Sequence, residues 1–142
     1  MRPIEVLLVE DSPTDIALTR EGMEVAKFAN RLTVVEDGAD ALDYLRGRGA
    51  FADRRLPDLI LLDLNIPKVS GFDVLKQIKE SEQLRQIPVV VLTTSKDEHD
   101  VVRAYREFAN CFISKPVDFS KFADIVRAID SFWFSIVALP NR

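Results

Sequence analysis

Short runs of apolar residues recur along the chain, and segments of helical length separate them. Four of these runs contain no alternating polar positions, and they cover residues 6–9, 59–62, 89–92 and 111–113. A continuous apolar run of this length is typical of a strand that helices cover on both faces of a parallel sheet. Residues 31–35 form a fifth candidate strand. The pattern predicts an α/β fold with a doubly wound sheet of five parallel strands and right-handed crossovers.

The segments between the strands begin with residues that favour helix starts. Ser12 is a good N-cap, and Pro13 suits the first helical position, where its missing N–H costs nothing. The predicted helices run from Pro13, from Gly38 to near Gly47, over 70–81, over 97–108, and from 119 onward.

Composition and charge fit one globular domain. The chain has 142 residues, 47% of them apolar and 30% charged, so we expect a single domain over residues 1–142. A formal net charge of -4 gives no electrostatic reason to expect nucleic acid or an anionic membrane as partner. The single Cys111 excludes an internal disulfide, and no stretch approaches the roughly 20 apolar residues that span a bilayer. We therefore expect a cytoplasmic protein.

Polar residues follow the ends of four predicted strands. They are Glu10, Asp11, Asp63, Thr93, Ser95 and Lys115. In an open parallel sheet, ligands bind beyond the carboxyl ends of the strands, so these side chains are expected at one edge. Three carboxylates there repel one another unless a cation is present. Mg2+ takes oxygen ligands from a few carboxylates and keeps several waters, so the pattern predicts a magnesium site, although Asp11 alone is equally well explained as a helix cap.

Asp63 is the candidate nucleophile of this site. It follows a buried strand, and a carboxylate in such a position can attack a phosphoryl group to form an acyl phosphate. The reaction needs charge neutralisation, which the metal and the ammonium group of Lys115 can supply. The Thr93 hydroxyl finds a strong acceptor only after phosphorylation, which makes it a candidate switch.

These residues and their spacing resemble the response-regulator receiver domain over almost the whole chain. Thr93 lies 30 positions after Asp63, and Lys115 lies 22 positions after Thr93. The matching segments are Glu10-Asp11, Asp63-Leu64-Asn65-Ile66-Pro67, Gly71, Thr93 and Lys115-Pro116. A match of four parts in order is far more specific than any lone motif.

The resemblance implies that a sensor histidine kinase phosphorylates Asp63. It implies magnesium bound by Glu10, Asp11, Asp63 and the backbone carbonyl of Asn65, and the flavodoxin-like strand order 2-1-3-4-5.

The resemblance also gives roles to residues beside the site. Phe112 stands where receivers have a switch aromatic, but it lacks the hydroxyl of the commoner tyrosine. Asn65 and Ser95 flank the site and are expected to tune water access to the phosphoryl group. Glu10 stands where many receivers have aspartate, which makes the metal geometry harder to foresee.

A narrower resemblance is to the cyanobacterial-type phytochrome response regulators. It depends on residues 44–49, residues 92–95 and the ending with Phe132-Trp133 and Leu139-Pro140. It implies a phytochrome as the cognate kinase and a regulator without an attached output domain.

The C-terminal segment carries more apolar residues than a receiver core needs. We expect residues 131–142 to form an extension of the last helix that is used in dimerisation. The predicted dimer surface consists of Ile129, Phe132, Trp133, Phe134 and Ile136. The alternative is a tail that folds back over its own domain.

Two other functions compete with the receiver. A haloacid-dehalogenase-like phosphatase also uses an aspartyl nucleophile, but it needs an acid two positions later, where this chain has Asn65. We therefore expect no turnover of a separate substrate. A flavodoxin-like interaction module that works without phosphate is the second alternative, although the acidic loop after the first strand repels phosphate unless a metal intervenes.

The loop over residues 47–57 is rich in arginine. It holds Arg48, Arg54 and Arg55, directly after Arg46, and acidic residues stand among them. A solvated loop is the simplest interpretation of this cluster.

Overall fold

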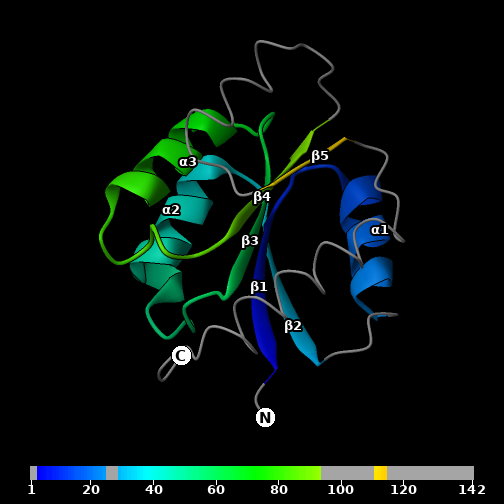
Figure 1. Ribbon diagram of the computed structural model, residues 1–142, viewed down its shortest axis with the longest axis horizontal. Helices are drawn as coiled ribbons and strands as arrows, with labels where there is room; N and C mark the ends of the chain where they lie inside the picture. The colour runs from blue at the N-terminus through cyan, green and yellow to red at the C-terminus, as the bar shows by residue number, and fades with distance from the viewer. Residues whose placement is uncertain (1–2, 25–28, 94–110, 115–142) are drawn as a thin grey trace.

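The sheet has five parallel strands in the predicted order. The computed structural model describes residues 3–24, 29–93 and 111–114. The strands are β1 (Ile4–Val9), β2 (Asn30–Val35), β3 (Leu59–Asp63), β4 (Val89–Thr93) and β5 (Cys111–Ser114). They form one sheet in the order β2-β1-β3-β4-β5 (Figure 1). All five predicted strands and their order are confirmed.

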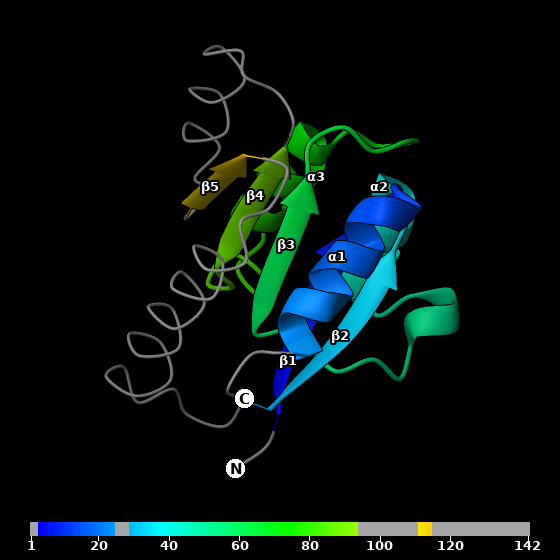
Figure 2. The same ribbon diagram turned by 90° about the vertical axis from the view of Figure 1, so that its right-hand side faces the viewer.

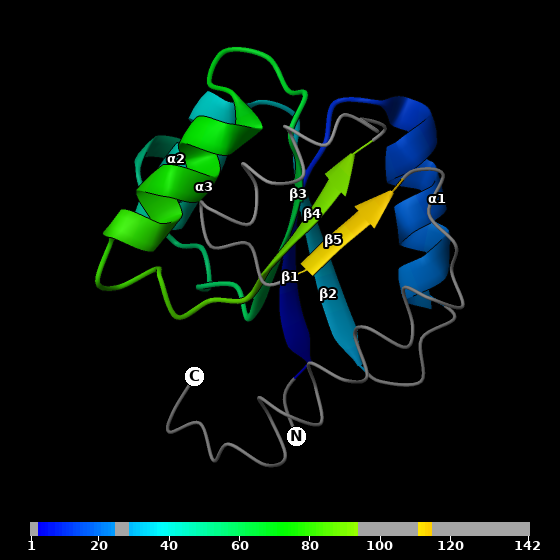
Figure 3. The same cartoon turned by 45° about the horizontal axis from the view of Figure 1, so that its top comes forward.

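Helices cover both faces of this sheet. They are α1 (Pro13–Glu24), α2 (Gly38–Arg46) and α3 (Gly71–Glu80), with a short 3-10 helix η1 (Gly49–Phe51) after α2. The α1 helix lies on one face, and α2 and α3 lie together on the other (Figures 1 and 3). The helices predicted over 97–108 and from 119 onward lie outside the described residues. Among the described helices, none is long and apolar enough to cross a membrane.

Polar side chains cap the starts of the three described helices, and one of them, Ser12, is the cap that the sequence predicts. The side chains of Ser12, Asp37 and Ser70 each accept the backbone N–H three positions later, at 3.3, 2.7 and 3.1 Å. These bonds satisfy N–H groups that have no partner within a helix. At the other end of α2, Gly47 has a φ of 65°, which favours glycine.

The core consists of two layers that the sheet separates. Leu7 and Ile60 are buried on the side of α2 and α3, whereas Leu8 and Leu61 are buried on the side of α1. Since successive side chains of a strand point to opposite faces and both faces are covered, the central strands need apolar residues at most positions. Each such side chain contributes about 1.5–3 kcal/mol on burial.

Arg54 is not a solvated loop residue. Its Nε donates to the carbonyl of Tyr44 at 2.8 Å, and its guanidinium NH2 group donates to the carbonyl of Leu45 at 2.8 Å. Carbonyls in the last turn of a helix have no helical partner, so Arg54 completes the end of α2. Arg48 and Arg55 are exposed, as the solvated interpretation expects.

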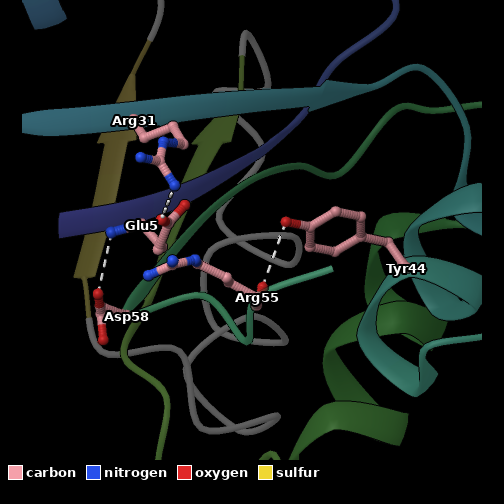
Figure 4. Close-up of polar contacts among 5 residues, drawn as sticks. All are labelled: Glu5, Arg31, Tyr44, Arg55 and Asp58. Atoms are coloured by element: carbon pink, nitrogen blue, oxygen red, sulfur yellow. Dashed lines mark hydrogen bonds and ion pairs between the residues drawn. The ribbon is translucent and has the colours of Figure 1, made fainter. Parts of the chain in front are cut away.

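Two buried carboxylates join the strands at the amino-terminal edge of the sheet. Glu5 and Asp58 are 4% and 1% exposed. The Glu5 N–H donates to Asp58 Oδ2 at 2.9 Å (Figure 4). The Asp58 N–H donates to the Glu5 carbonyl at 2.7 Å. Arg31 of β2 pairs with Glu5 Oε1 at 2.9 Å, so this polar group links β1, β2 and the start of β3.

We predict that Asp58→Ala lowers the free energy of unfolding by about 1–3 kcal/mol, because it removes the acceptor of a buried N–H. Urea unfolding at pH 7 measures the change. Asp53→Ala, an exposed acid in the same loop, is the control and should change stability by less than about 0.5 kcal/mol. Equal effects of the two substitutions would contradict a structural role for Asp58.

Candidate functional site

Three carboxylates meet at the carboxyl edge of the sheet. Glu10 and Asp11 follow β1, and Asp63 is the last residue of its neighbour β3. The strands all run toward the same edge, which Figure 2 shows by their arrowheads. One carboxylate oxygen of each residue lies within 4.8 Å of those of the other two. Glu10 and Asp63 are buried, and Asp11 is exposed, so solvent reaches the cluster from one side.

Backbone N–H groups hold the Glu10 carboxylate in place. Its Oε1 accepts the N–H groups of Asp11 and Ser12, each at 3.1 Å. These bonds turn the Glu10 side chain back toward its own backbone. Although glutamate has one methylene more than aspartate, the carboxylate therefore still lies at the carboxyl edge of the sheet. The bonds also offset part of the cost of burying this charge.

The loop after β3 determines the position of Asp63. Its Oδ1 accepts the N–H of Asn65 at 2.9 Å, and the loop is closed where the Gly71 N–H donates to the Leu64 carbonyl at 3.1 Å. A Cβ at Gly71 would lie 2.4 Å from the Asp63 carbonyl oxygen, so only glycine allows this approach. The carboxylate is therefore oriented before any ligand arrives.

The donor set suits a hard divalent cation. All three ligand atoms are carboxylate oxygens, and the exposed side of Asp11 leaves room for waters. Mg2+ prefers such sites, where a few carboxylates and several waters surround the ion. The cluster therefore fits the predicted cofactor, which supplies the positive charge that balances three neighbouring anions.

Four of the remaining predicted site residues belong to β4 and β5 or follow these strands in the sequence. In β4, Leu92 pairs with Asp63, so Thr93 ends the strand one position further along. Phe112 of β5 pairs with Val91 of β4. The side chains of Thr93 and Phe112, and all of Ser95 and Lys115, lie outside the described part of the chain, so their roles stay predictions.

Comparison with known families shows the family to which the chain belongs. Residues 6–127 match the response regulator receiver domain. The chain belongs to this family, and it is a two-component response regulator. The receiver predicted from the sequence is thereby confirmed.

Similar proteins also support the narrower resemblance. Response regulator Rcp1 of Synechocystis is 41% identical over 138 residues, which cover 97% of this chain and 94% of Rcp1. The solved Mn2+-bound form of Rcp1 has a TM-score of 0.83 at 40% identity and covers 98% of this chain and 100% of its own. A phosphorylated cyanobacterial phytochrome response regulator, RcpA, has a TM-score of 0.84 at 41% identity. The match covers 99% of this chain and 100% of RcpA. Similarity is not confined to phytochrome regulators: a probable methanogenesis regulatory protein, FilR2 of Methanothrix harundinacea, is 45% identical over 134 residues, 92% of this chain and 84% of FilR2.

The sequence interpretation missed a contact beside the site. It used Asp37 and Gly38 only to mark the start of α2. In the structure, the Gly38 N–H donates to the carbonyl of Pro67 at 3.1 Å, in the loop that carries Asn65. The one local signal was a glycine directly after a capping aspartate.

We predict that Asp11→Asn raises the thermal midpoint of the metal-free protein and weakens its further rise with Mg2+. Removing one of three neighbouring charges reduces repulsion, but it also removes an anionic ligand. In the wild-type protein, Mg2+ at a hundred times its dissociation constant should stabilise the fold by about 2.7 kcal/mol. Differential scanning fluorimetry measures both effects, with Asp53→Asn as the control. A full Mg2+ response in Asp11→Asn would argue against this ligand.

Proposed function

We propose that the protein accepts a phosphoryl group on Asp63 from a sensor histidine kinase. Mg2+ would be held by Glu10, Asp11, Asp63 and the backbone carbonyl of Asn65. The observation that carries the proposal is the cluster of three carboxylate oxygens within 4.8 Å of one another, in a chain that belongs to the receiver family. When bound, the ion neutralises the oxygens of the transferring phosphoryl group and its acceptor.

The chain's own residues orient the attack. An oxygen of the Asp63 carboxylate bonds to phosphorus while the bond from phosphorus to the donor nitrogen breaks, which leaves an acyl phosphate on Asp63. The Asn65 N–H, 2.9 Å from Oδ1, limits rotation of the carboxylate. Lys115 would contact a phosphate oxygen, and Thr93 would donate its hydroxyl to another once the phosphate is present. Phe112 would change position together with Thr93. Ser95 and Asn65 would tune the access of water to the phosphoryl group.

A separate phosphatase activity is not expected. Phosphatases that use an aspartyl nucleophile need an acid two positions later, and an amide such as that of Asn65 does not transfer protons in the required way. This supports a role in self-phosphorylation and dephosphorylation only.

The proposed kinase is a phytochrome, and the proposed assembly is a homodimer. Similarity to Rcp1 and RcpA along nearly the whole chain supports the first part. The second depends on the sequence pattern of Ile129, Phe132, Trp133, Phe134 and Ile136, which lie outside the described residues. The proposed unit is a single receiver domain over residues 1–142, with residues 131–142 used for dimerisation, in the cytoplasm. We expect neither nucleic acid nor a membrane as partner.

We predict that acetyl phosphate with Mg2+ adds one phosphoryl group, which intact-mass spectrometry detects. The adduct should be labile to hydroxylamine because it is an acyl phosphate, and it should need the metal. Asp63→Asn should abolish it, whereas Asp53→Asn should not. If no phosphoryl group is added under any condition, Asp63 is a structural acid and the domain is a phosphate-independent interaction module.

We predict that Trp133→Ala combined with Phe134→Ala converts a dimer into a monomer, because aromatic residues contribute most of the energy of such interfaces. Sedimentation velocity measures the change. Arg48→Ala, an exposed residue of the loop after α2, is the control. If the dimer persists after the double substitution, the C-terminal segment is instead a tail that folds back over its own domain.

A further inference from the structure

We propose that the start of α2 positions the metal-binding loop, and that Gly38 and Asp37 thereby set the affinity for Mg2+. The loop over residues 64–70 joins β3 to α3 and contains Asn65. We call its contacts with Asp37 and Gly38 the α2 clasp; on the loop side they involve Pro67, Lys68 and Val69. This inference rests on the proposed function, because it concerns the same metal site.

The loop is attached to the protein on two sides. On its core side, Leu64 and Ile66 are buried in the hydrophobic cluster under α2 and α3. At the start of α2, the Gly38 N–H donates to the Pro67 carbonyl at 3.1 Å. Asn65 is exposed between the two buried side chains, two positions after Asp63 and two before Pro67. Only Ile66 separates Pro67 from Asn65, so a displacement of Pro67 also shifts the Asn65 carbonyl.

Steric fit is the strongest part of the clasp. A Cβ at Gly38 would lie 2.0 Å from the carbonyl oxygen and 2.7 Å from the carbonyl carbon of Val69. Both are backbone atoms, so no side-chain rotation relieves the overlap. The helix and the loop can approach this closely only because residue 38 is glycine.

The charge contact is the weaker part. Lys68 Nζ lies 3.4 Å from Asp37 Oδ2, but the lysine side chain is 67% exposed, so solvent screens the pair and its contribution is small. Among the described residues, Lys68 is the one non-glycine residue with a positive φ, at 70°. That backbone conformation is unfavourable for a residue with a side chain, so the surrounding contacts must maintain it.

Asp37 connects the helix and the loop through one carboxylate. Its Oδ1 accepts the Asp40 N–H at 2.7 Å, and its Oδ2 faces Lys68. The bond to the Asp40 N–H, followed by the charge of Lys68, lowers the pKa of Asp37 below its ordinary value. The carboxylate is therefore ionised at neutral pH, where it favours both the helix start and the loop.

The test is Mg2+ binding by isothermal titration calorimetry, with the metal alone. Gly38→Ala should raise the dissociation constant about tenfold, as other changes behind metal ligands do. In acetyl phosphate kinetics, the same variant should need about tenfold more Mg2+ for half-maximal rate but approach the wild-type rate at saturation. Lys68→Met should change affinity less than about twofold, because its ion pair is exposed. Lys76→Met removes an exposed 3.9 Å pair with Glu80 on α3 and is the matched control, with no change expected.

A second measurement does not depend on a variant that folds. If the clasp raises the affinity for Mg2+, then Mg2+ must stabilise the clasp by the same factor. Hydrogen exchange of the Gly38 amide, followed by NMR, should slow on adding Mg2+, whereas exchange of the Arg48 amide at the far end of α2 should not. A folded Gly38→Ala protein with wild-type Mg2+ affinity, or unchanged Gly38 exchange, would overturn the proposal. Because both readouts use metal without phosphate, they are independent of whether Asp63 is phosphorylated.

Discussion

Repulsion among three carboxylates at one edge of the sheet is the constraint on which this structure depends. Glu10, Asp11 and Asp63 would move apart in a flexible chain, yet one oxygen of each lies within 4.8 Å of the others. The apolar strands β1 and β3 supply the rigidity, because they pair directly and are buried on both faces. The burial of the strands thus offsets the cost of assembling a site for a doubly charged cation.

The two ends of the sheet resolve buried charge in different ways. At the amino-terminal edge, the Glu5 carboxylate pairs with Arg31, and the Asp58 carboxylate accepts the Glu5 N–H. At the carboxyl edge, backbone N–H groups satisfy part of the Glu10 and Asp63 carboxylates, and three acids lie close enough together to hold a cation. One end therefore stabilises the fold, and the other responds to a ligand.

Asp63 leads directly into a loop that contains Asn65 and whose position depends on several elements. The same short segment contributes buried side chains to the core, a backbone carbonyl to α2, and the start of α3. The phosphoryl group that we propose at Asp63 would therefore act on a loop that is packed against two helices. Such a loop can transmit a local change in charge, because packed contacts rearrange together rather than deform gradually.

The sequence pattern by itself determined the strands, the start of α1 and the acids that meet at the edge, and the resemblance to receivers supplied the strand order. Continuous apolar runs require two covered faces, caps act within three residues, and parallel strands bring their carboxyl ends together. Only the tertiary structure decided the role of Arg54 at the end of α2, the Glu5–Asp58 pair, and the contact of Gly38 with Pro67. These interactions join segments far apart in the chain or depend on a single backbone distance. No local pattern encodes such distances, because they follow from how the packed elements fit together.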